Sequence, residues 1–201
     1  MFLFQDYDTD KQFPALGFGA RIPPTGQVSH EFFLNLRPDT PYCAGVDGLL
    51  AAYYTALQSV SLYGPTNFSP VIEHVARFAN AYQDGRQYFV LLILTDGIIT
   101  DLEATKHSII RASTLPMSII IVGVGNEDFS TMEELDSDKQ LLRAGSHVAA
   151  RDIVQFVELR KFVRGNTWDK EMLAKEVLYE IPNQLVQWMT QRKIKPLPKP
   201  T

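Results

Sequence analysis

Two continuous apolar runs constrain the fold of this chain more than any other feature of its sequence. They cover residues 88–94 and 117–125, and neither run alternates between apolar and polar side chains. Runs of this kind are typical of parallel strands that are buried on both faces by helices. Residues 101–115 lie between them and carry apolar side chains at helical spacing, so the segment is predicted to form a strand–helix–strand crossover.

Helix and strand patterns continue on both sides of this unit. We predict a hairpin of residues 14–20 and 28–34 around a turn at 23–26, helices over 46–60 and 68–82, and a last strand over 153–157. The amphipathic stretch 168–191 contains Pro182, which predicts either two helices or one kinked helix. The expected fold is therefore α/β, a doubly wound, mostly parallel sheet flanked by helices.

Composition excludes several classes of protein. The 201 residues suit one large domain, and a net charge of −4 argues against broad binding of nucleic acid. The single cysteine, Cys43, rules out an intrachain disulfide and fits a reducing compartment. No apolar run is long enough to span a bilayer. Residues 192–201 are rich in lysine and proline and are expected to form a solvated tail, with weak contact to anionic lipid as the alternative.

Two residues are candidate metal ligands. Asp96 follows the strand at 88–94, and ligands of such sheets bind outside the carboxyl ends of the strands. Thr66 lies in a loop that leads into the helix predicted at 68–82. A carboxylate with a neutral hydroxyl suits Mg²⁺ or Mn²⁺. Spacing alone leaves a second interpretation open, in which Asp96 forms a turn and Thr66 caps a helix.

Five segments together resemble the copine domain. They are residues 13–24, 64–67, 94–97, 115–125 and 150–157, and the similarity runs from about residue 5 to 197. The resemblance implies a fold like von Willebrand A and integrin I domains, with a divalent metal at an adhesion-type site built from three loops. Thr66 matches the threonine loop of this site and Asp96 matches its aspartate loop.

The third loop of the site, Asp-x-Thr-x-Ser at the end of the first central strand, is not found in the chain. Residues 128–132 begin like this motif, but they end in Met132 and follow the wrong strand. The resemblance therefore implies that residues 1–191 form an N-terminally incomplete copine domain. We expect a gapped or re-registered sheet where the central strand is missing.

The resemblance also implies a binding module rather than an enzyme. Its expected partners are intracellular proteins, with Mg²⁺ or Mn²⁺ at the incomplete site. Calcium and membrane phospholipid would bind through C2-type domains outside this chain. Copines are expected in the cytoplasm, with calcium-dependent recruitment to the plasma membrane and roles in signalling and trafficking.

Two alternatives remain open. The first is a metal-dependent phosphohydrolase that uses Asp96, although Ile98 occupies the place where a second carboxylate is usual. The second is a fragment that binds no metal. Asp136 and Asp138 do not form a calcium loop of the EF-hand type, because the glycine and the terminal glutamate are missing.

Overall fold

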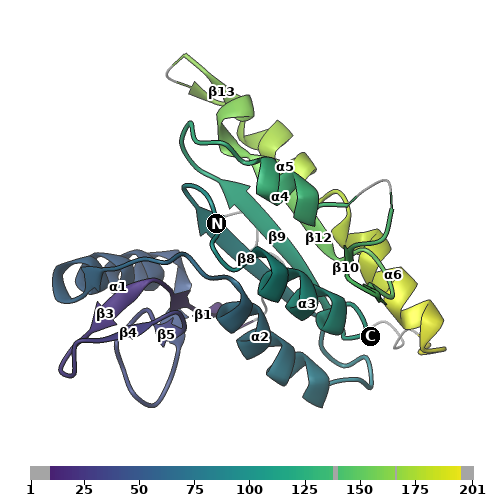
Figure 1. Cartoon of the computed structure of the whole chain (residues 1–201), viewed down its shortest axis with the longest axis horizontal. Coiled ribbons are helices and arrows are strands. Elements are labelled where there is room, and N and C mark those ends of the chain that lie inside the picture. The colour runs from purple at the N-terminus through teal and green to yellow at the C-terminus, as the bar shows by residue number, and fades with distance from the viewer. Residues whose placement is uncertain (1–9, 138–139, 166, 196–201) are drawn as a thin grey trace. The chain divides into compact units, whose positions relative to one another are not determined.

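The structure is a computed structural model that describes residues 10–137, 140–165 and 167–195. The chain divides into two units, Met1–Val71 and Ile72–Thr201 (Figure 1). Each unit is described here by itself. The basic tail is seen only as far as Lys195, so most of the predicted tail lies outside the described residues.

The second unit is built on a three-stranded parallel sheet. Its strands are β8 (Phe89–Thr95), β9 (Met117–Gly123) and β12 (Val154–Glu158), in the order β12-β9-β8. All seven residues of the central strand β9 are buried. A strand with neighbours on both sides and helices around it meets no water, which explains why its sequence is apolar without interruption. The α/β prediction is confirmed.

Helices flank this sheet. They are α2 (Ser69–Ala81), which begins at the boundary between the units, α3 (Leu102–Ala112), α4 (Ser130–Leu135), α5 (Lys170–Leu178) and α6 (Ile181–Gln191). Pro182 lies in the first turn of α6, where its missing N–H removes no helical hydrogen bond. The stretch 168–191 therefore contains two helices, not one kinked helix. Figure 1 shows α4, α5 and α6 on the β12 side of β9.

Several short elements of the second unit were not predicted. They are α4, the hairpin of β10 (Arg143–Ala144) and β11 (His147–Val148), a 3-10 turn at Leu159–Phe162, and the pair β13 (Val163–Arg164) and β14 (Thr167–Trp168). Elements of two to six residues carry too little periodicity to be seen in a sequence.

The sheet stops at β8. Within the part of the chain that the structure describes, β8 pairs with β9 alone, and the N-terminal strands form small sheets of their own. The three strands pair in one continuous register, and the expected gap or re-registration where a central strand is missing stays a prediction.

The first unit consists of short strands around one helix, α1 (Gly45–Ser59). The strand pairs are β1 (Gln12–Pro14) with β6 (Tyr42–Ala44), β2 (Leu16–Gly17) with β5 (Phe32–Phe33), and β3 (Ala20–Ile22) with both β4 (Gln27–Ser29) and β7 (Ser61–Leu62). One cluster of its core contains Ala15, Cys43 and Ala52, with Leu34 and Leu49 packed against them.

The predicted hairpin is partly right. Ile22 pairs with Gln27 across the turn, as expected. The single strand at 14–20 is wrong, because this stretch breaks into separate short strands. The backbone of Ala15 bonds with Pro41 and Leu34, and Gly19 has a φ of +67° that interrupts an extended strand.

Candidate functional site

Asp96 lies at the carboxyl end of β8, directly after the buried residue Thr95. Its side chain is exposed, and the chain bends at Asp96 and Gly97. Val124 donates a backbone hydrogen bond of 2.8 Å to the Thr95 carbonyl, which ties the start of this bend to the end of β9. The sheet thus presents a carboxylate to solvent at the edge where ligands of α/β sheets bind.

The loop after β9 lies beside Asp96 at this edge. A side chain at Gly97 would come within 3.8 Å of Cγ of Glu127. Asp128 accepts hydrogen bonds from the Ser130 backbone N–H at 2.9 Å and from the Ser130 hydroxyl at 3.1 Å. Asp128 therefore stabilises the turn that leads into α4.

Thr66 lies in the first unit, in the loop between β7 and α2, and is half-buried. Phe68 anchors this loop, because it is fully buried and packs edge-on against Phe18 with ring centroids 5.6 Å apart. The backbone N–H of Tyr63 donates to the Gly19 carbonyl at 2.8 Å on the other side of the loop. The loop that carries Thr66 is thus held in place by its own unit.

Thr66 and Asp96 belong to different units, and the structure describes the surroundings of each one separately. Their joint binding of a metal therefore stays a prediction.

A second group of carboxylates was missed by the sequence analysis. Asp136, Asp152 and Glu180 each place a carboxylate oxygen within 4.8 Å of the others, and all three side chains are half-buried. This acidic cluster could hold a metal ion. The three residues are far apart in the sequence and follow no ligand motif, so no spacing rule would have found them. Asp138, considered with Asp136 earlier, lies outside the described residues.

The fold explains why these carboxylates meet. Asp136 ends α4 and accepts a hydrogen bond from the Phe156 backbone N–H at 2.9 Å, while Asp152 accepts one from Val154 at 3.1 Å. Both donors lie on β12, which is the last strand of its sheet. Glu180 precedes α6 and accepts a hydrogen bond from Nε2 of Gln184 at 2.9 Å.

Arg151 fixes the backbone that leads to Asp152. Its side chain is fully buried and donates to the carbonyls of Leu115 at 2.6 Å, Met117 at 2.8 Å and Gln184 at 3.4 Å. Burial lowers the pKa of Arg151, and the Tyr88 phenol opposes that shift. The same burial raises the pKa of Tyr88, whose oxygen lies 3.4 Å from the guanidinium.

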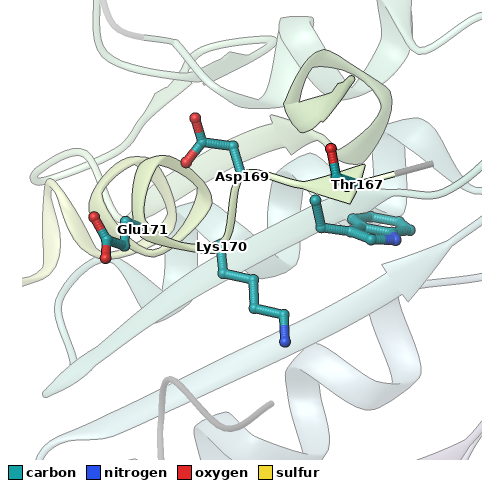
Figure 2. A pocket seen from close by; sticks show the side chains of 5 residues that line it. Thr167, Asp169, Lys170 and Glu171 are labelled. Atoms are coloured by element: carbon teal, nitrogen blue, oxygen red, sulfur yellow. The ribbon is translucent and has the colours of Figure 1, made fainter. Parts of the chain in front are cut away.

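A shallow hollow beside α5 does not form a site. It is lined by residues 167–171, and Figure 2 shows the Lys170 side chain pointing away from those of Asp169 and Glu171. Asp169 already accepts a hydrogen bond of 3.0 Å from the Met172 backbone N–H at the start of α5. These side chains do not converge on one point.

The parallel sheet, its flanking helices and the carboxylate at the carboxyl end of β8 define a protein of the von Willebrand A-like class. The family model for copines matches residues 2–197, so the chain belongs to the copine family. It is 52% identical over 202 residues to nicotinic receptor-associated protein 1 of Caenorhabditis briggsae. That match covers 96% of this chain and 32% of the worm protein, so the chain spans about a third of its relative's length.

No helix among the described residues is both long and apolar enough to cross a membrane.

Proposed function

We propose that this chain is the partner-binding domain of a copine-family protein, and that a divalent cation at Asp96 assists the binding. The observation that supports this most directly is the exposed carboxylate at the carboxyl end of β8, directly after the buried residue Thr95. Thr66 is the proposed neutral ligand. The ion is Mg²⁺ or Mn²⁺, since both accept hydroxyl and carboxylate oxygens together with water.

The proposed role is binding rather than catalysis. A cation held by few protein ligands keeps open coordination positions, and one of them can accept a carboxylate of a partner protein. Ile98 is 58% exposed two residues beyond Asp96, where a hydrolase of the type considered above would carry its second carboxylate. An ion bound by this loop therefore keeps a position for a carboxylate of a partner protein. The loop does not carry, at position 98, the second carboxylate that such a hydrolase would use.

The rest of the proposal concerns the longer protein. Calcium-dependent binding of phospholipid is assigned to C2-type domains outside this chain, which would bring the whole protein from the cytoplasm to the plasma membrane. The worm relative is named for association with a nicotinic receptor. We therefore propose the intracellular part of a membrane receptor as the first class of partner to test.

Thermal unfolding with and without millimolar Mn²⁺ tests the ion. A metal that binds only the folded chain raises the unfolding midpoint, and Asp96→Ala should lose most of that rise. Asp84→Asn, which removes another exposed carboxylate of the same unit, should keep it. An equal rise in all three proteins would show that Asp96 is not a ligand.

A binding assay tests the partner separately. The chain should retain an intracellular receptor fragment in Mn²⁺ and release it in EDTA, and Asp96→Ala should bind weakly in both. Equal binding in Mn²⁺ and EDTA would exclude the metal-assisted mode while leaving a protein-binding function in place.

A further inference from the structure

The two outer strands of the parallel sheet have different edges. Among the residues that the structure describes, the strand order is β12-β9-β8, so β12 and β8 each have one side without a strand beside it. At β12 that side is capped. The N–H of Phe156 donates to the Asp136 carboxylate at 2.9 Å, and the N–H of Val154 donates to Asp152 at 3.1 Å. These bonds occupy the groups with which β12 would bind a further strand, and Figure 1 shows α4 and α5 on the same side of β9.

The backbone of β8 bonds to the β9 side through alternate residues. The N–H of Phe89 donates to the Pro116 carbonyl at 2.8 Å. The carbonyl of Thr95, at the other end of the strand, accepts from Val124 at 2.8 Å. Successive residues of a strand direct their backbone groups to opposite sides, so the residues between these two ends fall into two alternating sets. Those whose N–H and carbonyl groups face away from β9 are Val90, Leu92 and Leu94.

The outward edge of β8 is open. No residue in the described part of the chain bonds to the outward backbone groups of Val90, Leu92 and Leu94. The side chains of the same residues share one face of the strand, on which Val90 is 39% and Leu94 is 56% exposed. β8 contains no charged residue and no proline, which natural sheets use to keep their edges from pairing. This edge therefore fits an extended, uncharged strand.

We propose that β8 of a second copy of this chain pairs with this edge in the antiparallel direction, which joins two three-stranded sheets into one. The two-fold axis passes beside Leu92, so Leu92 lies opposite Leu92 of the second copy and Val90 lies opposite Leu94. Residues that face each other as a hydrogen-bonded pair in an antiparallel ladder exchange both their N–H and their carbonyl groups. The pairing therefore satisfies the outward backbone groups of Val90, Leu92 and Leu94 in both copies.

A second copy matches this edge in length, polarity and charge. Its β8 is the same apolar strand of seven residues, and no charge inside it repels the first copy. The antiparallel direction places Asp96 of one copy opposite Tyr88 of the other, whose phenol oxygen lies 2.7 Å from Ser118 within its own sheet. A parallel arrangement would set the two Asp96 side chains beside each other. Because β12 is capped in both copies, the assembly closes as a dimer and does not extend into a fibre.

Amide exchange measured by NMR over a series of protein concentrations tests the pairing. In the dilute chain the amides of Val90, Leu92 and Leu94 should exchange rapidly, while those of Leu91 and Ile93 are protected by β9. At high concentration all five amides should be protected, and sedimentation should show a dimer. A contact through one strand edge is smaller than a standard interface of roughly 800 Å² per partner, so we expect a dissociation constant on the order of 10 μM.

A pair of charge variants tests the register. Val90→Lys with Leu94→Lys places like charges opposite each other across the dimer, and so does Val90→Glu with Leu94→Glu. Each variant alone should stay monomeric, and a mixture of the two should recover the dimer, because lysine then lies opposite glutamate. Both side chains are exposed, so the monomer should stay folded. Val186→Lys, at a residue of α6 that is 60% exposed, is the matched control and should dimerise like the unsubstituted chain.

A chain that stays monomeric at every concentration would overturn the proposal. Slow exchange of the outward amides in the dilute chain would do the same, since another strand would then already cover the edge. A dimer in which these amides still exchange rapidly, or one that both charge variants retain, would reject pairing through β8. The dimer should form equally in Mn²⁺ and in EDTA, so failure of this pairing and failure of the metal proposed at Asp96 are separate results.

Discussion

The two units of this chain reach a folded state in different ways. The second unit contains seven-residue strands, and its central strand β9 is wholly buried. The first unit has strands of only two or three residues, and fewer of its described apolar side chains are buried, among them Phe13, Cys43, Val46 and Phe68. Because burial of apolar area is the main stabilising term, the second unit is expected to resist unfolding more than the first.

The contrast extends to the backbone. In the second unit a parallel ladder satisfies consecutive residues of β8, β9 and β12. In the first unit the ladders are only two or three residues long, and Ala15 between two of them donates to Pro41 and accepts from Leu34. Hydrogen bonds in short ladders open more easily than those inside a long one, so local opening should begin in the first unit.

The largest expected effect is that of Ile120→Ala in β9. Ile120 is fully buried, and its truncation should lower the free energy of unfolding of the second unit by about 2–5 kcal/mol. Denaturant unfolding followed by tryptophan fluorescence measures this. Leu62→Ala in the first unit is the control, since Leu62 is 75% exposed and its loss should cost less than about 0.5 kcal/mol. Similar losses in the free energy of unfolding for both variants would contradict the expected difference between the two units.

Cys43 reports directly on the first unit. It is the only cysteine in the sequence, it is 5% exposed, and burial raises the pKa of its thiol. A thiol reagent therefore reacts only after the first unit opens. We expect opening there to need about 1–3 kcal/mol less than unfolding of the second unit. Labelling of Cys43 should thus precede the loss of Trp188 fluorescence as denaturant is added.

A matched variant sharpens this measurement. Cys43→Ala combined with Ala112→Cys moves the thiol to a fully buried position on α3 of the second unit. Its labelling should coincide with the fluorescence change. If both thiols react together, the units unfold as one and the proposed difference is wrong.

Trp188→Phe should have a smaller effect that is confined to the second unit. The indole N–H donates to the Thr114 carbonyl at 3.1 Å, and the ring packs edge-on against Tyr88. Phenylalanine keeps an aromatic ring but loses the donor, and Arg192 still donates to the same carbonyl. We expect a loss of about 1–2 kcal/mol, measured by circular dichroism, with no change in Cys43 labelling.

The smallest effect concerns the ion pair of Glu73 on α2 and Arg111 on α3. Burial raises the pKa of Glu73, but hydrogen bonds from Ser108 and Arg111 and the nearby positive charges outweigh it, so the pKa is lowered overall. A lowered pKa means that the ionised form stabilises the fold at neutral pH. Both side chains are partly exposed, so Glu73→Gln should cost less than about 1 kcal/mol at pH 7.

The pH dependence distinguishes this ion pair from packing. The stabilisation is complete above the unfolded pKa of glutamate and disappears as the pH falls through the lowered pKa of Glu73. Unfolding curves of the variant and the unsubstituted chain should therefore converge in acid. A difference that stays constant over this range would mean that charge plays no part.

Sequence reasoning worked best where one pattern decided the structure. The apolar runs predicted strands at β8 and β9, because a strand buried on both faces must be apolar throughout. The expected burial is confirmed for β9 but is wrong for β8, where Val90 and Leu94 are exposed. The first unit was harder to predict, because Ala15 pairs with two different segments and Gly19 has a positive φ, which together break a strand that looked continuous. Asp96 was placed correctly at the end of β8 because its position follows from the strand itself.

The acidic cluster could not be predicted. Asp136, Asp152 and Glu180 meet only because α4 ends beside β12 and α6 begins there. Asp136 and Asp152 each look like an ordinary cap in the sequence, and nothing in the order of residues indicates that the caps converge. Tertiary packing, not local pattern, creates such a site.

Arg151 has a consequence for the order in which the second unit assembles. A guanidinium is always charged, and here it donates to the carbonyls of Leu115 and Met117 at the start of β9, to Tyr88 and to the Gln184 carbonyl on α6. Until α6 arrives, one side of that charge must remain in water. Docking of α6 is therefore the step that removes Arg151 from water.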